Sequence, residues 1–258
     1  MTPIIIPLKK NMEYLIVCPL VFLAGFIDAI AGGGGLISLP AYLLAGLPPH
    51  MAIGTNKLSS AVGTTVATAQ YASKGYMLWK MALPSCILAL LGSWVGSQLS
   101  LLVPDRAFMI VMLIALPLIA FYVFTHKTLA RDTEPSITTR TWVVVLASAF
   151  FIGMYDGFYG PGTGTFLMLL LTGMAHLTLR QSAGITKVIN LSSNIMSLCV
   201  FLLNGTVVLQ LGLAAAVFSV AGNYLGARSF IKKGETIARP VIITVLTILI
   251  VKVIYDGI

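Results

Sequence analysis

Charged residues are scarce in this 258-residue chain. Asp, Glu, Lys and Arg together make up 9% of it, against about 25% in ordinary globular domains. A chain so poor in charge cannot cover a water-facing surface, which excludes a soluble globular protein. Cysteine is also rare: Cys18, Cys86 and Cys199 are isolated from one another, so neither a metal-site spacing nor a disulfide framework is present.

Apolar residues make up 58% of the chain and form runs near 20 residues long, without period-2 alternation. This pattern predicts an all-α polytopic membrane protein and not a transmembrane β-barrel. The formal net charge of +8 comes mainly from lysines and arginines between the apolar runs. Such residues set the orientation of membrane helices, so we expect the lipid bilayer, and no nucleic acid, as a partner.

The apolar segments follow one another in the same order twice. They are expected at 14–31, 36–46, 51–73, 81–103 and 107–124, and again at 141–159, 164–175, 182–203, 207–227 and 240–255. The second segment of each set reaches only about halfway across a membrane. The sequence therefore predicts a first transmembrane repeat at 1–124, a cytoplasmic linker at 125–140 and a second transmembrane repeat at 141–258.

Individual residues match between the two halves. "GFIDAIAGGGG" (25–35) aligns with "GMYDGFYGPGTG" (153–164), which places Asp28 on Asp156. "AIGTNK" (52–57) aligns with "SAGITK" (182–187), which places Lys57 on Lys187. "GSWVGSQ" (92–98) aligns with "GNYLGAR" (222–228), and the GxxxG spacing in both predicts close helix contact. Duplicated halves are typical of secondary transporters.

The positions of the lysines and arginines decide between parallel and inverted repeats. If each glycine-broken pair of segments enters and leaves on one side, ten basic loop residues share one face and four lie opposite. If the pair crosses once, the division is eight to six. The positive-inside rule favours the first arrangement. We therefore expect two inverted repeats, each with a Gly-broken re-entrant helix pair plus three full transmembrane helices.

Glycines interrupt the apolar stretch shortly after each aspartate. Glycine in a helix interior costs roughly 1 kcal/mol relative to alanine, and a broken helix at membrane depth is tolerated only against protein or a water-filled cavity. The free N–H groups of the half-helix that follows attract anions. The residues expected to line an anion-binding cavity here are Gly33, Gly34, Gly35, Gly162, Thr163 and Gly164. The alternative is that these glycines only permit close helix packing.

Four ionisable residues lie inside apolar segments, where each costs about 2.5–3.5 kcal/mol to insert. We expect Lys57 and Lys187 to supply positive potential for the anion, and Asp28 and Asp156 to hold the broken backbone or carry a coupling proton. The amides of Asn56, Asn190 and Asn194 complete the expected binding site. Three alternatives stay open: lysines that snorkel to the interface, aspartates that only accept glycine N–H groups, and Asp–Lys pairs within each half.

No Ser-His-Asp, Cys-His or paired-carboxylate arrangement suggests catalysis, so no enzyme activity, cofactor or metal site is expected. The chain also has no ATPase motif. These features predict a secondary transporter of a small anionic solute that works by alternating access. The alternatives are an anion channel and a non-transporting membrane assembly subunit, and the sequence leaves a homodimer open.

Two stretches carry a family resemblance. "AGFIDAIAGGGGLISLPAYLLAGLPPHMAIGTNK" (24–57) and "GMYDGFYGPGTGTF" (153–166) resemble the TauE/SafE sulfite exporter family, also called the 4-toluene sulfonate uptake permease (TSUP) family. The resemblance implies a carrier of sulfite, thiosulfate or organosulfonates in a bacterial or archaeal inner membrane. Many members have Ala-Thr-Ser near the start of the segment after the short helix, where this chain has Gly54-Thr55-Asn56-Lys57 and Gly184-Ile185-Thr186-Lys187, so it resembles a subgroup of undefined substrate.

Overall fold

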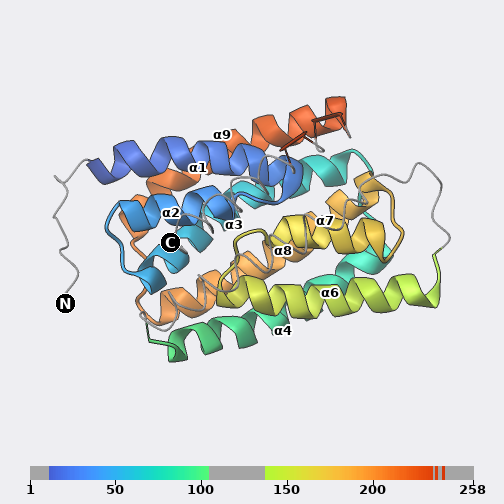
Figure 1. Cartoon of the computed structure of the whole chain (residues 1–258), viewed down its shortest axis with the longest axis horizontal. Coiled ribbons are helices and arrows are strands. Elements are labelled where there is room, and N and C mark those ends of the chain that lie inside the picture. The colour runs from blue at the N-terminus through green and yellow to red at the C-terminus, as the bar shows by residue number, and fades with distance from the viewer. Residues whose placement is uncertain (1–11, 105–136, 235, 238–239, 242–258) are drawn as a thin grey trace, which may run out of the picture.

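The computed structural model describes residues 12–104, 137–234, 236–237 and 240–241, and all regular structure in this part of the chain is helical (Figure 1). The helices follow the predicted segments closely. They are α1 (Met12–Ala31), α2 (Gly35–Leu44), α3 (Pro49–Ser73), α4 (Trp79–Leu102), α6 (Thr139–Phe158), α7 (Thr163–Gly173), α8 (Leu179–Leu203) and α9 (Leu209–Lys233). Two predicted segments lie outside the described residues: 107–124, and 240–255 beyond its first two positions.

Five of the described helices, α1, α4, α6, α8 and α9, are long and apolar enough to cross a membrane. A helix of 20 residues is about 30 Å long, the thickness of a bilayer core. The α3 helix has 25 residues but is more polar, because it carries side chains such as Thr55, Asn56 and Lys57. The chain is thus an all-helical, multi-pass membrane protein.

The α2 and α7 helices are short, with 10 and 11 residues, and each follows a break in the apolar stretch. Residues 32–34 separate α2 from α1, and residues 159–162 separate α7 from α6. The α2 helix begins against α1, because a Cβ atom on Gly34 would lie 2.6 Å from the carbonyl oxygen of Ala24 and from the Cβ of Asp28. Both predicted helix breaks are therefore present in the structure.

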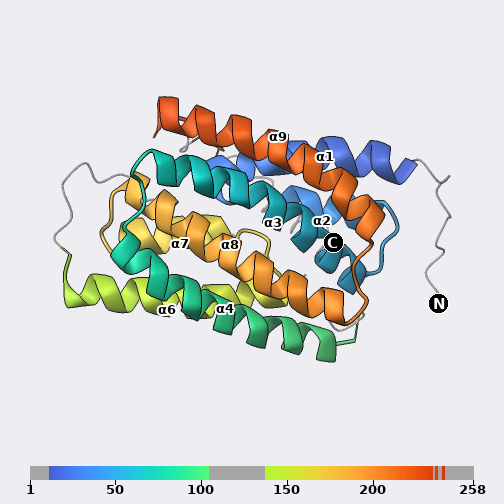
Figure 2. The same cartoon turned by 180° about the vertical axis from the view of Figure 1, so that it is seen from behind.

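The helices pack as two bundles of four. The first bundle contains α1, α2, α3 and α9, and the second contains α4, α6, α7 and α8. They form the upper and lower layers in Figure 1, and Figure 2 shows the same layers from behind. The two bundles meet along α3 and α8, with a smaller contact between α1 and α7.

Each bundle contains one helix from the other predicted repeat. The α9 helix of the second repeat packs on α1 and α3, and α4 of the first repeat packs on α6 and α8. If each helix is exchanged with its equivalent in the other repeat, for example α1 with α6 and α4 with α9, the pattern of contacts stays the same. This is expected of a duplicated chain. The bundles therefore do not coincide with the sequence halves 1–124 and 141–258.

Glycines allow the closest helix contacts, as the GxxxG spacing predicts. Gly92 and Gly96 of α4 lie against α6, and Gly222 and Gly226 of α9 lie against α1. A Cβ atom on any of them would overlap a carbonyl oxygen of the facing helix. Small residues therefore bring these backbones together at the centre of each bundle, as is usual in membranes.

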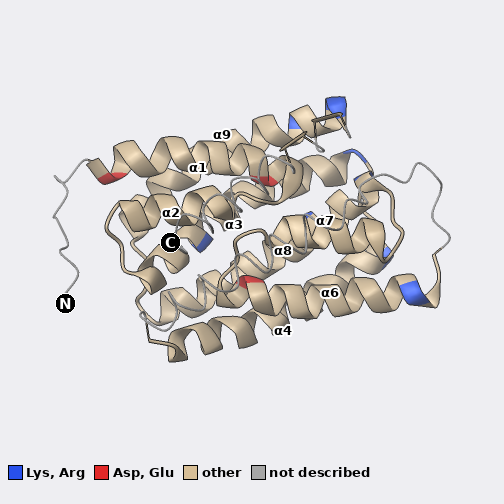
Figure 3. Cartoon of the chain, viewed as in Figure 1, with Lys and Arg blue, Asp and Glu red and all other residues tan. Residues whose placement is uncertain are grey.

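Basic residues gather toward one end of the molecule (Figure 3). This end contains the last turns of α3 and α9 and the first turns of α4, α6 and α8. The Arg180 guanidinium lies 5.8 Å from the centre of the Tyr76 ring, which joins the start of α8 to the turn after α3. The described basic residues in this group are Lys74, Lys80, Arg140, Arg180, Arg228, Lys232 and Lys233.

Candidate functional site

The two helix breaks meet in the interior. The N–H of Gly164, in the first turn of α7, donates a hydrogen bond of 3.1 Å to the carbonyl oxygen of Gly32, directly after α1. A Cβ atom on Gly164 would lie 2.5 Å from the Cα of Gly32, and Gly32 itself has a φ of +72°. The Thr165 hydroxyl adds a hydrogen bond of 2.8 Å to the carbonyl oxygen of Ala31. Glycine is thus required here for close packing as well as for backbone freedom.

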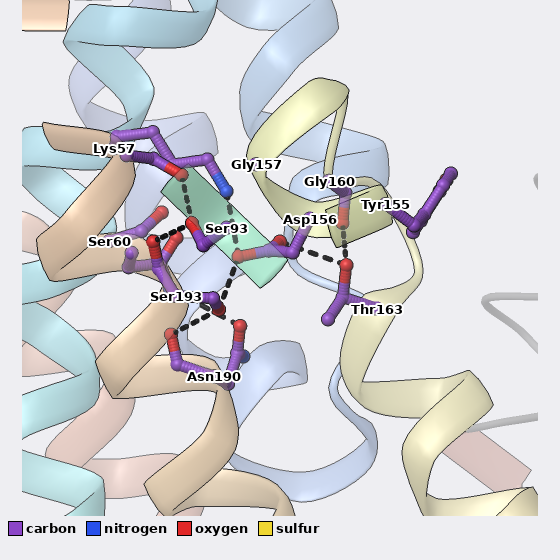
Figure 4. A network of polar contacts seen from close by, with 12 residues as sticks. Lys57, Ser60, Ser93, Tyr155, Asp156, Gly157, Gly160, Thr163, Asn190 and Ser193 are labelled. Atoms are coloured by element: carbon purple, nitrogen blue, oxygen red, sulfur yellow. Dashed lines mark hydrogen bonds and ion pairs between the residues drawn. The ribbon is translucent and has the colours of Figure 1, made fainter. Parts of the chain in front are cut away.

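An ion pair lies next to this contact. The Nζ of Lys57 in α3 is 2.8 Å from Oδ2 of Asp156 in α6, and the two side chains are 2% and 3% exposed. Figure 4 shows the hydroxyls that complete the carboxylate's coordination. Thr163 donates to Oδ1 at 2.8 Å, and Ser193 donates to Oδ2 at 2.6 Å. Asp156 therefore holds both Lys57 and the first residue of α7.

A second ion pair occupies the equivalent place on the other side. The Nζ of Lys187 in α8 lies 2.7 Å from Oδ2 of Asp28 in α1, and it also donates to the backbone oxygen of Asp28 at 2.5 Å. The same carbonyl oxygen accepts the N–H of Gly32 at 2.8 Å, so Lys187 adds a second donor at the end of α1. Lys187 is 2% exposed, as is Lys57, and neither lysine snorkels to an interface.

Each lysine pairs with the aspartate of the other repeat. The sequence left open a pairing within each half, and that pairing is wrong: Lys57 contacts Asp156, and Lys187 contacts Asp28. Both ion pairs also join the first bundle to the second, because α1 and α3 belong to one and α6 and α8 to the other. A buried charge is tolerated when it is paired and hydrogen-bonded, which both pairs satisfy.

A polar cavity lies beside the Lys57–Asp156 pair. Its volume is about 30 Å³, on the scale where one water molecule needs roughly 10–15 Å³. The cavity therefore has room for about two water molecules. The walls come from α1, α2, α3, α6, α8, α9 and the first residue of α7. The lining residues are Val21, Ala24, Gly25, Asp28, Gly32, Gly34, Gly35, Ser38, Asn56, Lys57, Ser60, Thr64, Asp156, Gly160, Thr163, Asn190, Asn194, Ser219 and Asn223.

The structure brings most of the predicted site residues together around this cavity. Those that line it are Gly34, Gly35, Asn56, Lys57, Thr163, Asn190, Asn194, Asp28 and Asp156. Gly33, Gly162, Gly164 and Lys187 are not among its lining residues. Gly164 packs against Gly32, and Lys187 forms an ion pair with Asp28. These two residues therefore contact lining residues of the cavity and do not line it themselves.

The starts of the two half-helices differ in what they offer a solute. The amide N–H groups of Gly34 and Gly35, at the start of α2, donate to no residue in the described part of the chain. At the start of α7, the N–H groups of Thr163 and Gly164 already donate to Gly160 and Gly32. Among these four amides, only those at the start of α2 are left without an acceptor in the described residues.

Several lining residues were missed because they are small or lie beside a packing motif. Ser219 and Asn223 belong to α9, whose Gly222 and Gly226 indicated only helix contact. Two polar residues four positions apart on an apolar helix share one face, and this spacing could have identified them. Ser38 of α2 and Gly25 of α1 carry no comparable signal in the sequence.

Comparisons with known proteins agree with this architecture. A family model described as "Sulfite exporter TauE/SafE" matches residues 17–253. A "probable membrane transporter protein ORF9" from Sinorhizobium sp is 36% identical over 235 residues, covering 91% of this chain and 90% of that protein. A "probable membrane transporter protein" from Haemophilus influenzae is 35% identical over 237 residues, covering 91% and 92% of the two chains.

A further relative is the "probable membrane transporter protein YfcA" of Escherichia coli K12, 30% identical over 236 residues that cover 91% of this chain and 87% of that protein. No solved structure matches the chain. The family model spans both helix breaks and all four residues of the ion pairs, and each of these relatives covers 91% of this chain. The chain therefore belongs to the sulfite exporter TauE/SafE family.

Proposed function

We propose that this protein is a secondary transporter that carries small, sulfur-containing anions such as sulfite, thiosulfate or organosulfonates across the membrane. One observation carries the proposal: Lys57 lines the same cavity as Gly34 and Gly35, whose amide N–H groups donate to no residue in the described part of the chain. A helix N-terminus and a cation together favour a bound anion. The names of the relatives and of the family support transport and a sulfur oxyanion.

Alternating access follows from the arrangement of the bundles. The cavity lies where they meet, so rocking one bundle against the other about the α3–α8 contact exposes it to each side in turn. The two ion pairs cross this same boundary. Both ion pairs must therefore break or exchange partners during each transport cycle.

The ion pairs also provide a route to proton coupling. Lys57 is neutralised by Asp156, so an anion must compete with this carboxylate for the ammonium. Protonation of Asp156 removes the competitor and frees Lys57 for the anion. A proton and an anion that enter together leave the charge of the buried cluster unchanged, which avoids the cost of an unpaired charge in the membrane.

An inverted topology is supported by helix direction and by charge. In Figure 1, α1 and α6 are equivalent helices that run in opposite directions. The end that carries the basic residues is the cytoplasmic end by the positive-inside rule (Figure 3). We place the protein in a bacterial or archaeal inner membrane, with residues 125–140 in the cytoplasm.

The binding test is a thermal-shift screen of the purified protein against sulfite, thiosulfate, sulfonates and carboxylates. A ligand at 100 times its dissociation constant adds about 2.7 kcal/mol of stability. The matched control is the double variant Lys57→Met/Asp156→Asn, which keeps the site neutral but removes the ammonium. We expect at least one anion to stabilise the wild type and not this variant. Stabilisation by no member of the panel would refute the proposal.

Counterflow in proteoliposomes then separates a carrier from a channel. A carrier saturates and accumulates labelled anion against an excess of internal unlabelled anion, whereas a channel does neither. An imposed inward proton gradient is expected to accelerate uptake. Flux that shows no saturation and no counterflow would replace the carrier with the channel.

A further inference from the structure

Asn223 of α9 is a buried polar residue whose acceptor is unused. Its side chain is 2% exposed and lines the cavity. The amide Nδ2 donates to the carbonyl oxygen of Ser219 at 3.0 Å and to its hydroxyl at 3.4 Å. Oδ1 has no hydrogen-bond partner among the described residues. Buried side-chain acceptors are nearly always paired, so an unpaired one beside a cavity indicates a group that enters from outside.

Two glycines on neighbouring helices leave space for the side-chain amide of Asn223. A Cβ atom on Gly25 of α1 would lie 2.9 Å from Nδ2 of Asn223, and one on Gly63 of α3 would lie 2.6 Å from it. The carbonyl oxygen of Ser219 can only accept, so the group facing it must be the NH₂. The packing and this hydrogen bond together fix Oδ1 as the free atom.

The equivalent residue in the other repeat has a different role. Ser93 of α4 aligns with Asn223, and its hydroxyl is fully used within the protein. It donates to the carbonyl oxygen of Ser193 at 2.7 Å and contacts the hydroxyl of Ser197 at 2.7 Å. Ser93 is also absent from the cavity lining. The free acceptor is thus a feature of the cavity and not a consequence of the duplication.

The cavity consequently presents donors and acceptors together. Lys57 and the amides of Gly34 and Gly35 supply donors. Asn223 supplies a neutral acceptor, and Asp28 supplies a carboxylate on the same face of α1 as Gly25, three residues later. The Asp28 carboxylate is already paired with Lys187, so an anion with acceptors alone satisfies the donors and leaves Asn223 Oδ1 unpaired.

We infer that the site selects anions that carry a hydrogen-bond donor of their own, a hydroxyl, amine or acid proton that Asn223 Oδ1 accepts. This inference rests on the proposed function, since it assumes that an anion occupies the cavity. Asn223 is then a specificity residue. A site built to pair with a donor discriminates against the analogue that lacks it, because its own polar atom is left unpaired.

The experiment compares isosteric anions in which a methyl replaces a hydroxyl. The probes are 2-hydroxyethanesulfonate against propane-1-sulfonate, and glycolate against propionate, titrated into the purified full chain by calorimetry. We expect the hydroxyl member of a pair to bind wild type about tenfold tighter, the worth of one hydrogen bond. In Asn223→Ser, which installs the residue of the other repeat, the ratio should fall to about one.

The control variant is Gln70→Ala. The Gln70 amide donates to the carbonyl oxygen of Tyr224, so this variant removes a hydrogen bond to the residue next to Asn223 without changing the cavity lining. The tenfold ratio should persist in this variant. The inference fails, while the proposed function stands, if wild type binds both members of a pair equally or if the ratio persists in Asn223→Ser. If wild type binds no anion in the pairs or in the earlier screen, the proposed function fails, and the inference fails with it.

Discussion

The Nζ of Lys57 lies 2.8 Å from Oδ2 of Asp156, and this ion pair ties α3 of one bundle to α6 of the other. Both side chains are buried, so neither charge is exposed to bulk water. The attraction is offset by the loss of hydration, but removing one partner leaves the other charge alone. The pair thus matters more for which states the protein can adopt than for its net stability.

Neutralising only one member of this pair should therefore destabilise the protein. We expect Lys57→Met to lose about 3–5 kcal/mol, because Asp156 is left as an unpaired buried charge. Adding Asp156→Asn should restore most of the loss, since the amide oxygen can still accept from Thr163 while the NH₂ group donates to the hydroxyl oxygen of Ser193. Thermal unfolding in detergent measures both effects. A single variant as stable as wild type would contradict the reading of this pair as fully buried.

Much of this arrangement follows from sequence patterning. Runs of apolar residues and the repeated order of long and short segments predicted the eight described helices, because membrane thickness fixes helix length. The glycines and the charge beside each of them predicted the two breaks. Asp28, Asp156, Lys57 and Lys187 were identified because an ionisable residue in an apolar run is costly unless it has a function.

The partners in the two ion pairs, and the choice of residues that line the cavity, could not be predicted in the same way. Which aspartate faces which lysine depends on how the two bundles meet along α3 and α8, and periodicity along one chain does not encode that contact. Gly164 and Gly34 look alike in sequence, yet one fills a backbone contact and the other lines the cavity. Asn223 was missed because the GxxxG motif that begins at its neighbour Gly222 predicted only a helix contact.

The contact between the two breaks should be intolerant of any side chain. In Gly164→Ala the new Cβ would lie 2.5 Å from the Cα of Gly32, where only backbone could move. We expect a loss of about 1–3 kcal/mol or more, the usual cost of overpacking. Gly173→Ala is the control in the same helix, since nothing lies within 4 Å of that position. Equal melting temperatures for the two variants would show that the breaks do not touch.

Gly160 should be needed for anion binding as well as for folding. A Cβ atom there would lie 3.1 Å from Nζ of Lys57 and 2.9 Å from Oδ1 of Asp156, so Gly160→Ala displaces the ion pair. Its φ of +102° adds backbone strain. Gly75→Ala controls for strain alone, because Gly75 has a φ of +73° with no atom within 4 Å. The stabilisation by sulfite is expected to disappear in Gly160→Ala and persist in Gly75→Ala; its loss in both would mean that strain is the cause.

Membrane topology can be tested at one pair of equivalent positions. Lys74 follows α3 and Asn204 follows α8, and the alignment of the repeats places them at the same point. Both are exposed turn residues, so a cysteine at either should react with a membrane-impermeant maleimide. Cys18, Cys86 and Cys199 are first replaced by serine or alanine to remove background labelling.

Inverted repeats put these two positions on opposite sides of the membrane, whereas parallel repeats put them on the same side. We expect Lys74→Cys to label only from the cytoplasm, where the basic end of the bundle lies, and Asn204→Cys to label only from outside. Labelling in intact cells and in inside-out vesicles separates the two cases. Labelling of both cysteines from one side would remove the inverted topology, and with it the symmetry that allows one rocking motion to open the cavity to either side.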